Sequence, residues 1–177
     1  MFKYMLSMAL TIPVFVFAAP KQFENVTTMM DEYNDYPSDF GAFKVLKEKP
    51  LSIQISPKVM NGDSEESIIN ASNKAAVYGA YRILLQTPND SVAIKVIPLS
   101  INMQTMNKEY LEAYKFSFKI NRVQAMALAK KNSGISKTNL LIGEDGYEWN
   151  GKFKECCFTD TGTPGLNQFV KDLTHQK

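Results

Sequence analysis

Hydrophobic and polar residues alternate along three stretches of the chain, and this period of two is typical of strands with one buried face. The three stretches are residues 51–59, 92–96 and 114–120. The last is the clearest, because aromatic or branched side chains occupy every second position from Tyr114 to Ile120, with lysines and a serine between them. The pattern predicts three strands, each with a polar second face.

Apolar residues that recur every three or four positions predict helices between and after these strands. After the first strand, Ser64 and two glutamates stand in the order that begins a helix, and residues 87–90 contain the proline that ends it. Asn121 can cap a second helix, which Gly134 can end. Residues 166–173 predict a C-terminal amphipathic helix.

A β-hairpin is predicted near the C-terminus, because Asn150-Gly151 lies between two strand-like flanks. Its return strand would run through Cys157 and Phe158, and residues 144–146 would form a separate turn. Strands and helices in this order, with one polar face on each strand, predict an α+β fold. We expect a two-layer sandwich with a mixed or mainly antiparallel sheet and helices on one face, in preference to a doubly wound parallel sheet.

The first 18 residues have the three-part layout of a secretory signal peptide. Lys3 precedes an apolar run over residues 5–17, and Val16-Phe17-Ala18 places small or apolar groups at the positions that signal peptidase must fit. We expect cleavage after Ala18 and a periplasmic or secreted protein. The alternative is a retained membrane anchor, although the run is shorter than the ~20 apolar residues that a span needs.

Composition and charge describe a packed globular chain. Hydrophobic residues make up 45% of the sequence, which argues against wholesale disorder. A net charge of +2 provides no general electrostatic reason to bind nucleic acid. After the signal peptide, we expect a leader over residues 19–50, partly helical or mobile, and a single α+β domain over residues 51–177.

The sequence contains no recognisable catalytic or cofactor motif. His175 is the only histidine and lies near the C-terminus, which argues against a Ser-His-Asp or Cys-His arrangement and against a usual zinc site. The glycine-rich phosphate-binding motifs are absent. We therefore expect no cofactor and no metal. Glu155 and Asp160 are the least implausible catalytic pair, and they would serve a carboxylate-based hydrolase.

The only two cysteines, Cys156 and Cys157, are adjacent, which is unusual for an exported protein because a bond between neighbours closes no chain loop. Three states are compatible with the sequence. They are two reduced, partly buried thiols, a vicinal or intermolecular disulfide, and a metal or redox role. The third is the weakest, because there is no second pair and no nearby histidine.

Two surfaces are candidates for binding. The polar face of the predicted sheet would carry Lys58, Lys95, Lys115 and Lys119. Such a face could hold an acidic partner, or it could be a solvated face on which lysines discourage edge pairing. Tyr78 and Arg82 lie four positions apart on the first predicted helix, so they should meet on its surface.

These observations favour an exported, non-enzymatic binding or accessory protein that acts through protein–protein contacts. An immunity or inhibitor protein, or a subunit of an envelope machine, would fit. One alternative is the hydrolase of Glu155 and Asp160, acting on cell-wall polymer or polysaccharide, which requires a cleft that holds both carboxylates. Another is a carrier of a small apolar molecule, which requires an empty apolar cavity between helices and sheet.

Overall fold

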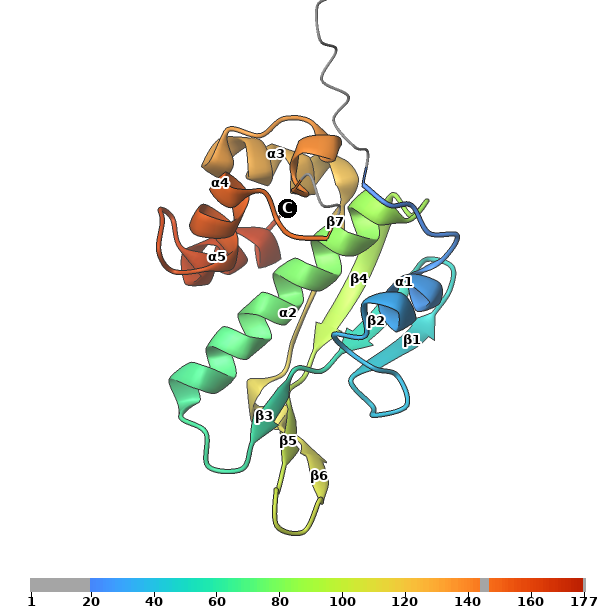
Figure 1. Cartoon of the computed structure of the whole chain (residues 1–177), viewed down its shortest axis with the longest axis vertical. Helices are drawn as coiled ribbons and strands as arrows, with labels where there is room; N and C mark the ends of the chain where they lie inside the picture. The colour runs from blue at the N-terminus through green and yellow to red at the C-terminus, as the bar shows by residue number, and fades with distance from the viewer. Residues whose placement is uncertain (1–19, 144–146, 177) are drawn as a thin grey trace, which may run out of the picture.

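The computed structural model describes residues 20–143 and 147–176, and within them it has an α+β fold, as the pattern predicts (Figure 1). The helices are α1 (Val26–Tyr33), α2 (Glu65–Gln86), α3 (Arg122–Ser133), α4 (Gly151–Phe153) and α5 (Leu166–Thr174). The strands are β1 (Phe43–Lys47), β2 (Ser52–Ile55), β3 (Lys58–Met60), β4 (Ser91–Val96), β5 (Leu99–Ile101), β6 (Lys108–Tyr110) and β7 (Phe116–Asn121).

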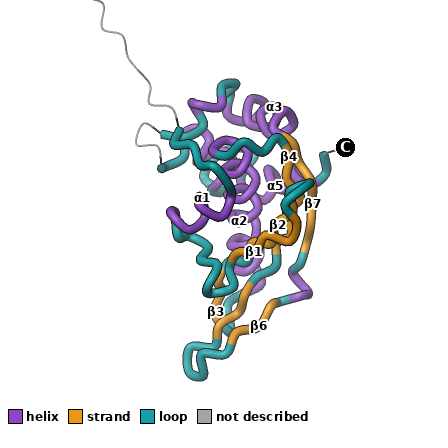
Figure 2. The backbone as a smooth tube through the Cα atoms, turned by 90° about the vertical axis from the view of Figure 1, so that its right-hand side faces the viewer, coloured by secondary structure: helices purple, strands orange, loops and turns teal. Residues whose placement is uncertain are grey.

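The main sheet is mixed, with strand order β1-β2-β4-β7. β2 and β4 are parallel, and the outer strands β1 and β7 pair antiparallel with them. The helices pack on one face of this sheet (Figure 2). Long α2 crosses that face and buries its second half, where Gly79 lies against the side-chain tips of Ile53, Ile55 and Ile94. The core therefore lies between α2 and the sheet.

A second group of helices extends this core beyond the end of the sheet. Tyr81 of α2 packs against Phe153, with 4.8 Å between ring centroids, and Phe169 of α5 packs edge-on against Phe153 at 5.8 Å. The Tyr81 hydroxyl donates a hydrogen bond to the Ala125 carbonyl of α3 at 2.8 Å. One buried aromatic cluster thus joins α2, α3, α4 and α5.

The single strand predicted over residues 51–59 is wrong, because the chain breaks there into β2 and β3. Pro57 has no backbone N–H to give to a strand ladder, so the main sheet does not continue through it. Beyond it, β3 pairs parallel with β5, and β5 pairs antiparallel with β6. These three strands form a smaller sheet that extends from the main one, and residues 99–107 at its tip carry no charged side chain.

Several predicted boundaries agree with the structure. The Ser64 side chain accepts a hydrogen bond from the Ser67 N–H at the start of α2, and Asn121 caps α3 in the same way at the Gln124 N–H. Gly134 ends α3 in the left-handed conformation, with φ +75. The strands predicted over residues 92–96 and 114–120 are present as β4 and β7, although β7 begins only at Phe116, because a 3-10 turn (Glu112–Tyr114) precedes it.

The hairpin predicted at Asn150-Gly151 is wrong. Asn150 is instead the N-cap of α4, where its side-chain oxygen accepts a hydrogen bond from the Lys152 N–H at 3.0 Å. Asn is favoured both in tight hairpins and at helix starts, and here the helix prevails. A π-helical turn (Lys154–Phe158) follows in place of the predicted return strand. The turn predicted at residues 144–146 lies outside the described residues, and on either side of it Ile142 and Trp149 form an antiparallel bridge.

Residues 20–50 pack on the rest of the chain. α1 lies on the same side of the sheet as α2 and buries Met29 and Met30, and the Phe23 N–H donates to the Gln86 carbonyl at 2.8 Å. β1 adds an edge strand to the main sheet. The predicted signal peptide lies outside the described residues. In the part of the chain that is described, no helix has both the length and the apolar character needed to cross a bilayer.

Candidate functional site

One face of the main sheet is turned away from the helices, and its side chains form two rows across all four strands. The pairing registers align the first row as Lys44, Gln54, Lys95 and Ser117. They align the second row as Lys47, Ser52, Ala93 and Lys119. We call these eight residues the lysine face.

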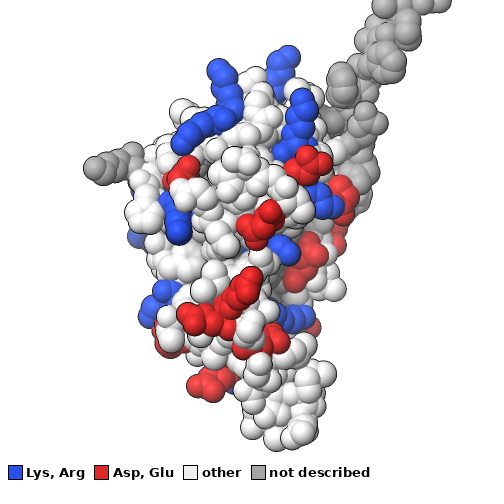
Figure 3. All heavy atoms as spheres, turned by 90° about the vertical axis from the view of Figure 1, so that its left-hand side faces the viewer, with Lys and Arg blue, Asp and Glu red and all other residues white. Residues whose placement is uncertain are grey.

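The lysine face is cationic, because the four strands of the main sheet contain four lysines and no aspartate or glutamate. Lys44, Lys47 and Lys119 are exposed, and Lys95 is half-buried on a central strand. The surface on the left-hand side of Figure 1 differs, because lysines and carboxylates are interspersed there (Figure 3). Positive charge is therefore segregated on the sheet.

Two of the four lysines predicted to share a face do so, namely Lys95 and Lys119. The placement of Lys58 is wrong, because it lies on β3 of the smaller sheet, with its ammonium 4.2 Å from the centroid of the Phe40 ring. Lys115 precedes β7 and forms an ion pair with Glu112 at 2.6 Å. That hydrogen bond lowers the pKa of Glu112, and the positive charge of nearby Lys95 adds a smaller effect.

Lys44 and Lys47 complete the face, and sequence reasoning missed both. They lie on β1, inside the segment expected to be a leader. The available signal was short, because only Phe43 and Val45 alternate with Lys44 before the pairing with β2 shifts register between Val45 and Lys47. An edge strand of five residues with a bulge gives little periodicity to detect.

Tyr78 and Arg82 meet in the middle of α2, as their spacing of four predicts, but their expected exposure is wrong. Each is only 5% exposed, because α1 and residues 147–158 cover this part of the helix. The guanidinium carbon of Arg82 lies 5.7 Å from the ring centroid of Tyr78, and 4.5 Å and 4.6 Å from those of Tyr33 and Trp149. Arg82 is thus held among aromatic rings.

The hydrogen bonds of Arg82 go to neutral acceptors. Its Nη1 donates to the Tyr33 hydroxyl at 3.3 Å and to Gln86 Oε1 at 3.1 Å, and its Nη2 donates to the Tyr147 carbonyl. Its Nε and the Tyr78 hydroxyl are buried, and neither has a hydrogen-bond partner among the described residues. Two adjacent buried donors therefore remain unused, which is uncommon in native proteins.

These two side chains line a pocket of about 570 Å³, called here the arginine pocket. Its walls include the aromatic residues Tyr36, Tyr78, Tyr147, Trp149 and Phe158, and its charged residues, among those described, are Lys58, Lys74, Arg82, Lys154, Asp35 and Glu148. Burial raises the pKa of Tyr78 far above its ordinary value, and Asp35 adds to the rise. The hydroxyl of Tyr78 is accordingly a neutral donor.

A larger open groove, of about 1060 Å³, lies between the N-terminal part of α2, β7 and α5. Asp160 lines it and accepts hydrogen bonds from Asn70 Nδ2 at 3.3 Å and from the Asn167 N–H at 3.5 Å. Glu155 lies on the π-helical turn, is exposed, and does not line this groove. The two carboxylates considered for a hydrolase therefore do not share the groove.

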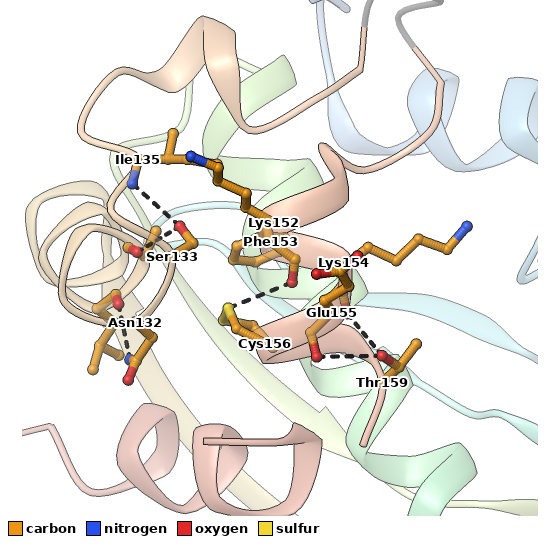
Figure 4. The surroundings of a disulfide bond; sticks show 12 residues. Asn132, Ser133, Ile135, Lys152, Phe153, Lys154, Glu155, Cys156 and Thr159 are labelled. Carbon is orange, nitrogen blue, oxygen red and sulfur yellow. Dashed lines mark hydrogen bonds between the residues drawn. A yellow bond between two sulfur atoms is a disulfide. The ribbon is translucent and has the colours of Figure 1, made fainter. Parts of the chain in front are cut away.

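Cys156 and Cys157 are joined in a vicinal disulfide and buried in the second helical group. Figure 4 shows Asn132 and Ser133, at the end of α3, beside the turn that carries the cysteines. The Cys156 sulfur lies 3.6 Å from the Phe153 carbonyl, and Thr159 Oγ1 donates to the Lys154 carbonyl at 3.1 Å. Of the three states compatible with the sequence, the structure has the intramolecular disulfide.

Within residues 20–143 and 147–176, no group of three or more histidine, cysteine, aspartate or glutamate side chains is arranged to hold a metal ion. Comparisons of the chain with protein-family models, with curated proteins and with solved structures found no match.

Proposed function

We propose that this protein is an exported binding protein without catalytic activity, and that it docks an acidic surface of a partner protein on the lysine face. The observation that carries the proposal is the segregation of charge on the main sheet, where four lysines stand on strands that have no carboxylate. Complementary charge raises the rate of encounter and disfavours wrong partners.

The position of Lys95 favours docking over protection against aggregation. Lysines that discourage edge pairing belong on edge strands, which accounts for Lys44, Lys47 and Lys119. Lys95 lies on β4, which is paired on both sides, so it protects no edge. Between the lysines stand only uncharged side chains, of which Gln54 is buried, Ser52 and Ala93 are half-buried and Ser117 is exposed.

Site-specific photo-crosslinking in intact cells tests this proposal. A photoreactive residue at Ser117, between the lysines, should capture one partner protein, whereas the same residue at Val123, which is 79% exposed on α3, should not capture it. The triple variant Lys44→Glu, Lys95→Glu, Lys119→Glu should abolish capture at Ser117.

Binding of the purified partner makes the test quantitative. The triple variant should raise the Kd by about tenfold or more, and added salt should weaken wild-type binding. The matched control reverses three exposed lysines elsewhere, Lys130, Lys137 and Lys152, and should leave the Kd unchanged. Equal losses in both triple variants, or binding that salt does not affect, would refute the lysine face as the docking surface.

Export is tested separately. We expect the protein in the envelope or secreted fraction, with an N-terminus at Ala19, because the first 18 residues have the layout of a cleaved signal. Edman sequencing or mass spectrometry of the protein purified from its own cells reads that terminus. A chain that retains Met1 would contradict cleavage, and a chain found only in the cytoplasm would contradict export.

A further inference from the structure

Arg82 is a buried cation, and the part of the chain that the structure describes provides it with no counter-ion. Among the described residues no carboxylate forms an ion pair with it, and its three hydrogen-bond acceptors are a phenol, an amide and a backbone carbonyl. Burial of a charge is unfavourable unless an opposite charge or a full set of hydrogen bonds compensates it. Aromatic rings offset part of this penalty. The unused Nε shows that the set of hydrogen bonds is incomplete.

The arginine pocket lies beside this cation, and among the described residues four cationic and two acidic side chains line it. One of the acids, Glu148, pairs with Lys154 at 3.1 Å. The other, Asp35, lies near the Tyr78 hydroxyl and raises its pKa, and it forms no ion pair with Arg82. The charge of Arg82 is therefore not matched by the acids of its own pocket.

We infer that the arginine pocket binds a small organic carboxylate that carries a flat apolar group. Arg82 and the hydroxyl of Tyr78 are two unused donors four residues apart on one helix, and a carboxylate has two oxygens to accept from them. Because both donors are buried, the ligand reaches them only after a small movement of the side chains that cover the pocket. The inference does not depend on the lysine face.

The walls of the pocket specify the apolar part of the ligand. Tyr36, Trp149 and Phe158 present ring surfaces, and a volume of about 570 Å³ lies within the usual range for small-molecule sites. A carboxylate fits better than a phosphate, because the more highly charged phosphate is bound by several backbone N–H groups or a cluster of arginines, whereas here one guanidinium stands among rings.

Fluorescence of Trp149 reports directly on this pocket, because it is the only tryptophan of the chain. We would titrate the mature protein with 3-phenylpropionate and with its neutral isostere, 3-phenylpropionamide. The carboxylate should produce a saturable change and bind about tenfold or more tightly than the amide. Equal affinity of acid and amide, or no response to the acid at about 10 mM, would overturn the inference.

Variants connect the response to the two donors. Arg82→Gln should remove the preference for the acid over the amide, and Lys152→Gln, which removes an exposed charge that does not line the pocket, should leave it unchanged. If Arg82→Gln does not fold, Tyr78→Phe keeps the ring, removes the hydroxyl, and should weaken binding of the acid by about three- to tenfold. An unchanged affinity in Tyr78→Phe would overturn the proposed pair of donors.

Two further probes identify the source of the carboxylate. N-acetyl-glycyl-phenylalanine has a chain-terminal carboxylate beside a ring, and its C-terminal amide is the matched control. Saturable binding of 3-phenylpropionate alone assigns a free small acid, and tighter binding of the dipeptide assigns the C-terminus of a peptide. Inorganic phosphate that binds more tightly than either would refute a carboxylate site.

Discussion

Tyr81 is completely buried, and Tyr78 is nearly so. Burial raises the pKa of both hydroxyls well above the ordinary tyrosine value, and at Tyr78 the Asp35 carboxylate adds to the rise. Above pH ~10 the unfolded chain therefore releases protons that the folded chain retains. The folded state then binds more protons than the unfolded state, so stability falls as the pH rises.

We expect the free energy of unfolding to decrease above pH ~10 by up to about 1.4 kcal/mol per pH unit for each of these two tyrosines. Urea unfolding followed by circular dichroism at pH ~8, ~10 and ~11 measures this decrease. Tyr81→Phe should be less stable near pH 8 by about 1 kcal/mol, because it loses the hydrogen bond to the Ala125 carbonyl, and its alkaline decline should be shallower. Parallel pH profiles for the two proteins would contradict this assignment.

Gly79 sits where α2 approaches the sheet, and its neighbours are side-chain tips. A Cβ there would lie 3.5 Å from Cδ1 of Ile94 and 3.6 Å from Cδ1 of Ile55, which are ordinary contact distances. Alanine gains up to about 1 kcal/mol over glycine in a helix interior. Gly79→Ala should therefore raise the free energy of unfolding by about 0.5–1 kcal/mol, and Gly79→Leu should lower it by about 1–3 kcal/mol through overpacking.

Gly162→Ala is the contrasting substitution. A Cβ at Gly162 would lie 2.7 Å from the Glu155 carbonyl oxygen, which is backbone and cannot rotate away. We expect Gly162→Ala to lower the free energy of unfolding measured by urea titration, although it is the same glycine-to-alanine substitution as Gly79→Ala. A loss of stability in Gly79→Ala would show that α2 packs on the sheet more tightly than the distances indicate.

The junction of β7 and α3 depends on one residue. Asn121 ends the strand and caps the helix, and Gln124 completes a reciprocal capping box. Asn121→Ala should lower the free energy of unfolding by about 1 kcal/mol. Asn121→Ser, which still provides a capping oxygen, should lower it by much less. Val123→Ala, at an exposed position of the first helical turn, is the control and should change little in the same measurement.

The elements that could be predicted from the sequence are those with enough residues to show a period. α2, α3, α5, β4 and β7 have either repeating apolar positions or a recognisable cap, and each is present. The smaller sheet was not predicted, because the alternation of apolar and polar residues continues through Pro57, whereas the hydrogen-bond ladder of the main sheet stops there. The hairpin failed at Asn150, whose side chain satisfies the rules for a tight turn and those for a helix cap equally well.

The candidate sites were predicted less completely, because segments that are distant in the sequence determine which residues lie together and which are buried. These segments act by pairing with a strand or by covering a helix. Periodicity showed that Lys95 and Lys119 stand on polar faces, but only strand pairing joins Lys44 and Lys47 to them. The spacing on α2 showed that Tyr78 and Arg82 meet. Their burial arises from α1 and from the segment after residue 146, which no pattern on the helix itself reveals.

At the scale of the whole molecule, residues 20–50 belong to the fold as much as α2 does. They supply the edge strand β1 and the buried side chains of α1, and Tyr33 contributes both a ring and a hydroxyl to the surroundings of Arg82. The boundary predicted at residue 51 stays a prediction. The contacts favour a folding unit that includes residues 20–50.

A chain that begins at Leu51 should therefore lose much of its stability. Without β1 and α1 it would expose Ile53 and Ile55 along one edge of the core, and burial of such side chains contributes about 1.5–3 kcal/mol each, which is a large share of the 5–15 kcal/mol by which a typical domain is stable. We expect residues 51–177 to lack a cooperative thermal transition that residues 20–177 show by circular dichroism. If the shorter chain unfolds cooperatively at the same temperature, residues 20–50 are an appendage, and the aromatic surroundings of Arg82 have formed without Tyr33.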